Sequence, residues 1–139
     1  MSTHLRLIIV AVLAFFACDQ PEQWELKPEP GSTVVIIGNT FAEGLQQSNY
    51  FETMLHLSFP THNLRVRNLG WSADEVGMNP RPLNFGSIHE HLHQQQADII
   101  IACFGMNESF KGLDSLANFK EDLRAFLKGL QSHKLNDSS

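Results

Sequence analysis

The stretch Val34–Phe41, VVIIGNTF, decides the fold of this chain. Its four leading residues are all β-branched, which favours a strand, and we expect that strand to span Thr33–Ile37. A continuous apolar run is typical of a strand that is buried on both faces of a parallel sheet. The strand runs into Gly38 and then presents the hydroxyl of Thr40. The functional question is whether that hydroxyl caps a helix or attacks a substrate.

Strand and helix patterns alternate through the rest of the chain. Apolar residues at helical spacing predict three helices, at Tyr50–Phe59, Ser87–Gln96 and Leu116–Leu130. Two further β-rich runs predict strands at Leu64–Leu69 and Asp98–Phe104. This alternation implies parallel strands joined by right-handed helical crossovers, and therefore an α/β sandwich. The first of these helices has capping-box spacing at Asn49 and Glu52 and is ended by Pro60.

The strand compositions predict the strand order 2-1-3. The first and third strands are continuous apolar runs and belong inside a sheet, whereas the alternating run LRVRNL suits an edge. The third strand then needs a neighbour on its far side, because an exposed Ile-Ile-Ile-Ala-Cys-Phe edge would promote aggregation. We therefore expect a truncated domain, or alternatively a partner chain that covers the edge of residues 98–104.

The N-terminal residues have the pattern of an exported protein. The first six residues carry one strong charge, Arg6, and are followed by the unbroken apolar run Leu7–Ala17, which suits a signal peptide. The alternative is that this run forms a buried strand or helix. The small residue before Cys18 resembles a lipobox, so lipidation would tether a bacterial lipoprotein to the periplasmic or cell-surface side of a membrane. The chain then divides into a signal peptide, an extended tether, a partial hydrolase-like domain and a polar tail, at residues 1–17, 18–32, 33–131 and 132–139.

Charge and cysteine content exclude several classes of protein. The chain has a net charge of −5, and removal of residues 1–17 would take away one Arg and no acid. Such a chain lacks the basic face that nucleic-acid binding needs. If Cys18 is lipidated, Cys103 stands in a run of Ile and Phe as a packed thiol without a disulfide partner. No residue pattern calls for a cofactor.

All three predicted strands end in Gly or Asn. The three segments are Gly38-Asn39-Thr40, Asn68-Leu69-Gly70 and Gly105-Met106-Asn107-Glu108. In an open parallel sheet, sites form at the carboxyl ends of the strands, where the strand order reverses. We therefore expect Thr40, Gly70 and Asn107 to converge on one crevice. The alternative is that Gly and Asn serve only as turn formers.

Taken in order, these segments resemble blocks I, II and III of the SGNH (GDSL-type) hydrolases. The runs VRNLGWSADEV, PRPLNFG and ACFGMNESF resemble a planctomycete-like branch of that family. The resemblance covers Thr33–Leu130 and implies a flavodoxin-like three-layer sandwich that hydrolyses acyl or acetyl esters, including those on carbohydrate. It further implies that the Thr40 hydroxyl is the nucleophile. The oxyanion donors would be the backbone N–H groups of Thr40 and Gly70 and the amide of Asn107.

The sequence departs from the family pattern in the nucleophile and the base. Thr replaces the nucleophilic Ser, and Asn39 replaces its Asp neighbour. No Asp-x-x-His block is present, and His133 has no acid three residues before it. Without a base a hydroxyl is a poor nucleophile, so a non-catalytic binding or assembly module is the alternative. In addition, Thr40 and Glu43 have capping-box spacing, which offers a purely structural role for Thr40.

Further residues near the strand ends are candidates for lining the pocket, namely Gly38, Asn39, Trp71, Asp74, Gly105 and Glu108. Arg81 lies in a Pro-interrupted loop that could approach them. A rival motif is His89-Glu-His-Leu-His93, which matches the His-Glu-x-x-His pattern of zinc proteases with Glu90 as base. No convincing third ligand accompanies it, so we expect a solvated helix face and no metal site.

Overall fold

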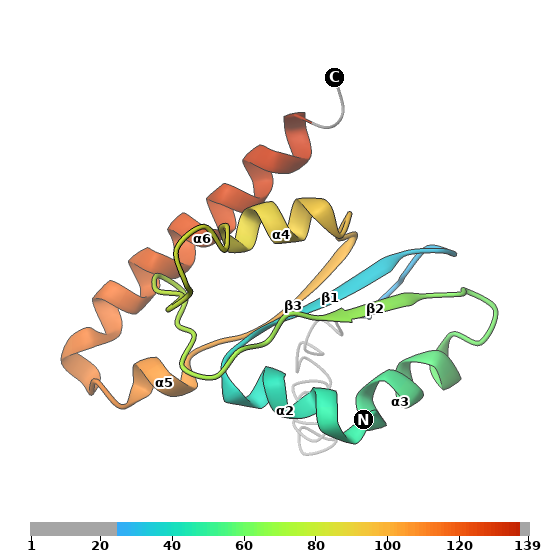
Figure 1. Cartoon of the computed structure of the whole chain (residues 1–139), viewed down its shortest axis with the longest axis horizontal. Helices are drawn as coiled ribbons and strands as arrows, with labels where there is room; N and C mark the ends of the chain where they lie inside the picture. Colours follow the sequence, from blue (N-terminus) through green and yellow to red (C-terminus); the bar gives the residue numbers. More distant parts are fainter. Residues whose placement is uncertain (1–24, 137–139) are drawn as a thin grey trace, which may run out of the picture.

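The computed structural model describes residues 25–136 of the chain (Figure 1). The predicted signal peptide and Cys18 lie outside the described residues. Within the described range no helix is long and apolar enough to cross a bilayer.

Strands and helices alternate as the sequence patterns predict. The elements are β1 (Thr33–Gly38), α2 (Thr40–Ser48), α3 (Tyr50–Ser58), β2 (Arg65–Asn68), α4 (Ile88–Gln94), β3 (Ile99–Cys103), α5 (Met106–Ser109), the 3-10 helix η1 (Leu113–Ser115) and α6 (Leu116–Asn136). The three predicted strands and three predicted helices are present, with bounds that differ by a few residues. Helices α2 and α5 are short additions, and α6 continues six residues beyond its predicted end at Leu130.

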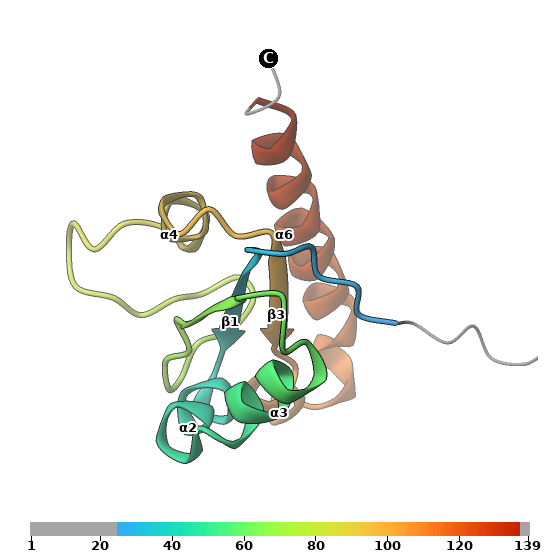
Figure 2. The same ribbon diagram turned by 90° about the vertical axis from the view of Figure 1, so that its right-hand side faces the viewer.

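The strands form a parallel sheet in the order β2-β1-β3, which confirms the predicted α/β fold and strand order. Helices α4 and α6 lie on one side of the sheet and α2 and α3 on the other (Figures 1 and 2). This division follows from right-handed crossovers, because the chain steps from β1 to β2 and then back past β1 to β3. The reversal of strand order therefore falls between β1 and β3.

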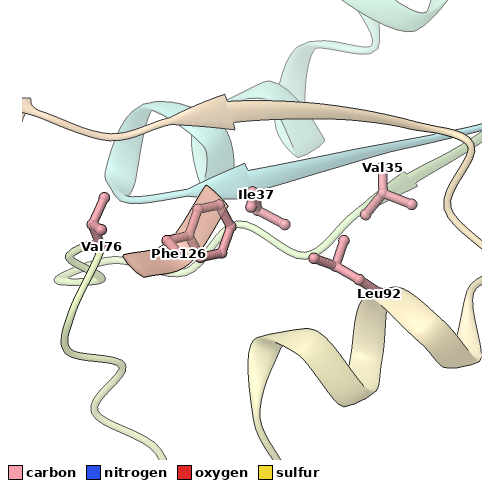
Figure 3. Close-up of a cluster of buried hydrophobic side chains, with 5 residues drawn as sticks. All are labelled: Val35, Ile37, Val76, Leu92 and Phe126. Carbon is pink, nitrogen blue, oxygen red and sulfur yellow. The ribbon is translucent and has the colours of Figure 1, made fainter. Parts of the chain in front are cut away.

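Strand β1 is the centre of two hydrophobic clusters. Val35 and Ile37 point to the first, where they pack with Val76, Leu92 of α4 and Phe126 of α6 (Figure 3). Val34 points to the opposite face. There it packs with Leu55 and Leu64, the other buried members of the second cluster. Full burial of such a side chain contributes about 1.5–3 kcal/mol, so β1 stabilises both layers at once.

Strand β3 occupies an edge of the described sheet. Among residues 25–136 it pairs with β1 alone, and Ile99, Ile100 and Ile101 are half-buried. The third strand was expected inside a sheet, and its apolar composition matches that position better than the one observed. Coverage of this edge by further chain or by a partner stays a prediction.

Two predicted helix caps are wrong. Asn39, one residue before Thr40, is the N-cap of α2, because its extended backbone lets Oδ1 accept a hydrogen bond from the Phe41 N–H at 3.2 Å. Glu43 does not reach back to the helix start. At the α2–α3 corner Asn49 has a φ of 49° and makes no side-chain cap, since one left-handed residue joins the two helices. The capping box that does form is that of Ser87 and Glu90 at α4.

Gly38 is required where β1 leaves the sheet. Its φ is +135°, and a Cβ there would lie 2.3 Å from the carbonyl oxygen of Cys103. We predict that Gly38→Ala lowers the free energy of unfolding by about 2 kcal/mol or more, through both strain and overlap. Urea unfolding followed by circular dichroism measures this loss of free energy of unfolding.

The matched control is Gly44→Ala in α2, because a Cβ at Gly44 meets nothing within 4 Å. This change should raise the free energy of unfolding by about 0.5–1 kcal/mol, as expected for Gly to Ala inside a helix. Equal effects of the two substitutions would show that the close approach at Gly38 is unimportant.

Candidate functional site

Backbone hydrogen bonds bring the three strand ends together at one edge of the sheet. The Trp71 N–H donates to the Gly38 carbonyl at 2.9 Å, and the Asn39 N–H donates to the Cys103 carbonyl at 3.3 Å. Helices α2 and α5 both start at this edge (Figure 1). The segments that contain Thr40, Gly70 and Asn107 therefore begin from neighbouring strand ends, where sites form in open parallel sheets.

Thr40 is exposed at the first position of α2. Because Asn39 provides the cap, the Thr40 hydroxyl is not used for capping, and it makes no hydrogen bond with any residue from 25 to 131. At this position the backbone N–H has no intrahelical acceptor. A helix N-terminus also favours negative charge. Thr40 thus offers an uncommitted hydroxyl next to an uncommitted N–H group.

Asn39 is almost fully buried at 1% exposure. Its Oδ1 caps α2, but its Nδ2 has no hydrogen-bond partner among the described residues. A buried donor without a partner is costly. The cap needs the side-chain oxygen alone, so the described contacts do not explain why Asn rather than Asp stands at this position.

Gly70 packs directly against the start of α2. A Cβ at this position would lie 2.6 Å from the carbonyl carbon and Cβ of Ala42, so only Gly fits. Its N–H donates to Oδ1 of Asn68 at 2.8 Å, and Nδ2 of Asn68 donates to the Ala42 carbonyl at 2.7 Å. The predicted oxyanion donor of Gly70 therefore already has an acceptor within the protein.

Asn107 and Glu108 hold the loop that follows β2. Nδ2 of Asn107 donates to the Asp74 carbonyl at 3.2 Å, which leaves one of its two N–H groups available. The buried carboxylate of Glu108 accepts from the N–H groups of Val76 and Gly105, both at 2.9 Å. The Glu108 carboxylate thus connects the start of α5 to this loop through two hydrogen bonds. No hydrogen bond joins Asn107 to Thr40 among the described side chains.

Asp74 does not line an open pocket. It is 1% exposed and forms a two-point ion pair with Arg81, in which the nitrogen–oxygen distances are 2.5 and 2.6 Å. The guanidinium carbon of Arg81 lies 4.6 Å from the centre of the Trp71 ring and 5.6 Å from that of Phe85. This stack fixes the loop between β2 and α4 around a fully paired charge.

A cavity of about 330 Å³ opens beside Gly70, between α2, this loop and the start of α4. Trp71 lines it, whereas Thr40 and Asn107 do not. Arg81 also lines it, from the Pro-interrupted loop. The other principal lining side chains were not named as candidates from the sequence: Glu43, Gln46, Phe85 and His91, with Asn68. Glu43 and Gln46 are three residues apart and so share one face of α2, which is the signal that could have identified them.

His91 is the histidine that reaches this cavity. Its Nε2 lies 2.9 Å from the Phe85 carbonyl oxygen, and a carbonyl can only accept, so Nε2 carries the proton. In the neutral ring Nδ1 is then an acceptor. Sequence reasoning treated His91 only as one of three helix-surface histidines.

The rival zinc motif is not assembled. Glu90 accepts a hydrogen bond from the Ser87 N–H at 2.6 Å, and the backbone and side-chain bonds to Ser87 lower the pKa of Glu90, which makes it a weaker base. His89 packs on Phe126, with ring centres 5.3 Å apart. The described part of the chain contains no group of three His, Cys, Asp or Glu placed to hold a metal ion.

Burial also raises the pKa of the Cys103 thiol, which therefore stays protonated.

Comparisons with known proteins give one distant likeness to a solved structure. No protein-family model and no curated protein matches the chain. A gut microbial diltiazem-metabolizing enzyme is similar in structure at a TM-score of 0.46 and 20% sequence identity. The match covers 80% of this chain and 25% of that enzyme, so the chain spans a small part of its length. We transfer no activity from a likeness at this level.

The Asp74–Arg81 pair gives a test of how the loop after β2 is held. Arg81→Met would leave a buried carboxylate without a partner, and we predict a loss of about 3–5 kcal/mol in the free energy of unfolding. Lys111→Met is the matched control, because the Lys111–Glu75 pair has a half-exposed lysine. The control should cost about 1 kcal/mol or less. Denaturant unfolding of both variants compares them, and similar losses would contradict the assignment.

Proposed function

We propose that this domain is an ester hydrolase of the SGNH type, with Thr40 as the nucleophile and acyl or acetyl esters as substrates, including esters on carbohydrate. The observation that carries the proposal is the state of Thr40. Its hydroxyl begins α2 at the reversal point of the sheet and is released from capping by Asn39. An exposed hydroxyl beside an unpaired helix N–H is the arrangement that acyl transfer needs.

In this mechanism the Thr40 hydroxyl attacks the ester carbonyl carbon, and the carbonyl oxygen gains negative charge. The backbone N–H of Thr40 and the second N–H of Asn107 would donate to that oxyanion. The Gly70 N–H, now 2.8 Å from Asn68 Oδ1, would share its hydrogen between the two acceptors. The alkoxide of the substrate leaves with a proton, and water then hydrolyses the acyl-Thr40 ester.

The hydroxyl proton has to be taken by a base, and none of the described residues hydrogen-bonds to Thr40 in that role. We propose that a further segment or a partner chain brings the base. The same neighbour would cover the edge of β3. In the cell we place the protein outside the cytoplasm, anchored to a membrane face through Cys18, which mass spectrometry of the lipidated N-terminus would test.

Substitution of Thr40 tests the nucleophile. In the chain together with the segment or partner that supplies the base, Thr40→Ala should lower kcat/KM for p-nitrophenyl acetate by about 10³-fold or more, as loss of a nucleophile does. Thr40→Ser should keep or raise the rate, because a primary alcohol lacks the methyl group that crowds attack. A fluorophosphonate probe should label the native chain and Thr40→Ser but not Thr40→Ala. An unchanged rate in Thr40→Ala would overturn the proposal.

A binding module on the same fold is the second candidate, and the occupied donors favour it. The Gly70 N–H and one Asn107 N–H are bonded within the protein, as expected where no oxyanion has to be bound. This function predicts saturable ligand binding with no turnover and no fluorophosphonate labelling. Labelling at Thr40 in intact-protein mass spectrometry would exclude it.

A further inference from the structure

The cavity beside Gly70 has a chemistry of its own. It shares Gly70 with the proposed catalytic edge, but Thr40 does not line it. A volume of about 330 Å³ is at the small end of the range of pockets that bind organic ligands. The proposed mechanism uses the backbone N–H of Gly70 but none of the side chains that line the cavity. The composition of the cavity lining therefore needs another explanation.

One wall of the cavity is aromatic. Trp71 and Phe85 meet edge to face with ring centres 6.1 Å apart, and they remain 46% and 42% exposed. A buried ion pair holds the rings in place, because the guanidinium of Arg81 packs over Trp71 and the Arg81 side chain is 10% exposed. The rings therefore form a rigid apolar surface that is open to a ligand.

Three polar side chains of the cavity offer acceptors. Oε2 of Glu43 accepts from the N–H and hydroxyl of Ser72, so Oε1 is left for a ligand. Nε2 of Gln46 donates to Oδ1 of Asn68 and to the Gly70 carbonyl, both at 3.2 Å, which leaves Oε1 of Gln46 as its available acceptor. When its ring carries one proton, on Nε2, Nδ1 of His91 is a third acceptor. A matching ligand has to bring several donors.

Charge selects among ligands that carry donors. The positive charge of Arg81 is matched by the two-point contact with Asp74, so the cavity has no unpaired cation for a phosphate or carboxylate. Among the described residues Glu43 has no basic partner, so a cation could pair with it, but a single positive charge would leave the acceptor of Gln46 without a donor. A neutral ring with several hydroxyl groups supplies donors to both acceptors. Its hydroxyls donate to Glu43 and Gln46, and its apolar face packs on the exposed rings.

We infer that this cavity is a sugar-binding subsite that holds one neutral pyranose ring. Its use as the site for the sugar part of a carbohydrate ester rests on the proposed function, whereas binding of the sugar does not. The subsite would place an ester group of the bound sugar near Gly70, at the border of the catalytic edge. The residues that select the ligand are Trp71, Phe85, Glu43 and Gln46.

Titration with simple glycosides tests the inference. The chain with Thr40→Ala, which removes turnover, is labelled with ¹⁵N and titrated with the methyl pyranosides of glucose, galactose, xylose and N-acetylglucosamine. At least one glycoside should shift the Trp71 indole N–H and the Gln46 amide signals saturably. Trp71→Ala and Gln46→Leu should each weaken that binding about tenfold. The matched controls are Phe110→Ala, an 80% exposed ring outside the cavity, and Gln47→Leu on the same helix.

The outcomes separate this inference from the proposed hydrolase. Saturable glycoside binding supports the subsite, and absence of ester turnover by the chain together with the segment or partner that supplies the base ends the catalytic claim alone. The subsite is overturned if a chain whose NMR spectrum is that of a folded protein turns over esters but binds none of these glycosides. That result leaves the hydrolase proposal standing. Stronger shifts of the same signals by choline or inorganic phosphate would also overturn it, because they would show a site for charge. Equal losses in the control variants would do the same.

Discussion

The close approach of backbones at two glycines is the constraint on which the rest of the structure depends. At the end of β1, Gly38 packs against the carbonyl group of Cys103. After β2, Gly70 packs against the backbone of α2. Neither position has room for a Cβ. The absence of two side chains lets three strand ends and two helix starts share one edge of the sheet. That edge carries the Thr40 hydroxyl and one wall of the cavity.

The sequence was sufficient for the architecture because that architecture rests on local patterns. The β-branched run of β1, the alternating run of β2 and the helical spacing of α3, α4 and α6 each reflect burial on particular faces. The strand order followed from the same burial argument. At β3 the predicted order is confirmed, while the expected neighbour stays a prediction, because an apolar run indicates what a strand needs and does not show whether a neighbour is present.

The candidate site was predicted less completely, because its geometry depends on contacts that spacing does not encode. Thr40 was correctly placed at a strand end, but its competing role as a cap depended on a one-residue difference that spacing alone could not resolve. Asp74 was placed near the site, yet its burial under Arg81 comes from a loop whose course no periodic pattern describes. Glu43 and His91 line the same cavity, from helices that are far apart in the sequence.

Glu43 also links the cavity to the proposed nucleophile mechanically. It lies about one turn after Thr40 on α2, and its carboxylate ties that helix to Ser72, the residue after Trp71 of the cavity wall. A ligand that contacts Glu43 therefore acts on the same rigid helix turn that positions the Thr40 hydroxyl. In such an arrangement, contacts remote from the bond that breaks contribute to rate as well as to affinity. Poorly fitting substrates would then be distinguished by slow turnover even at saturating concentration.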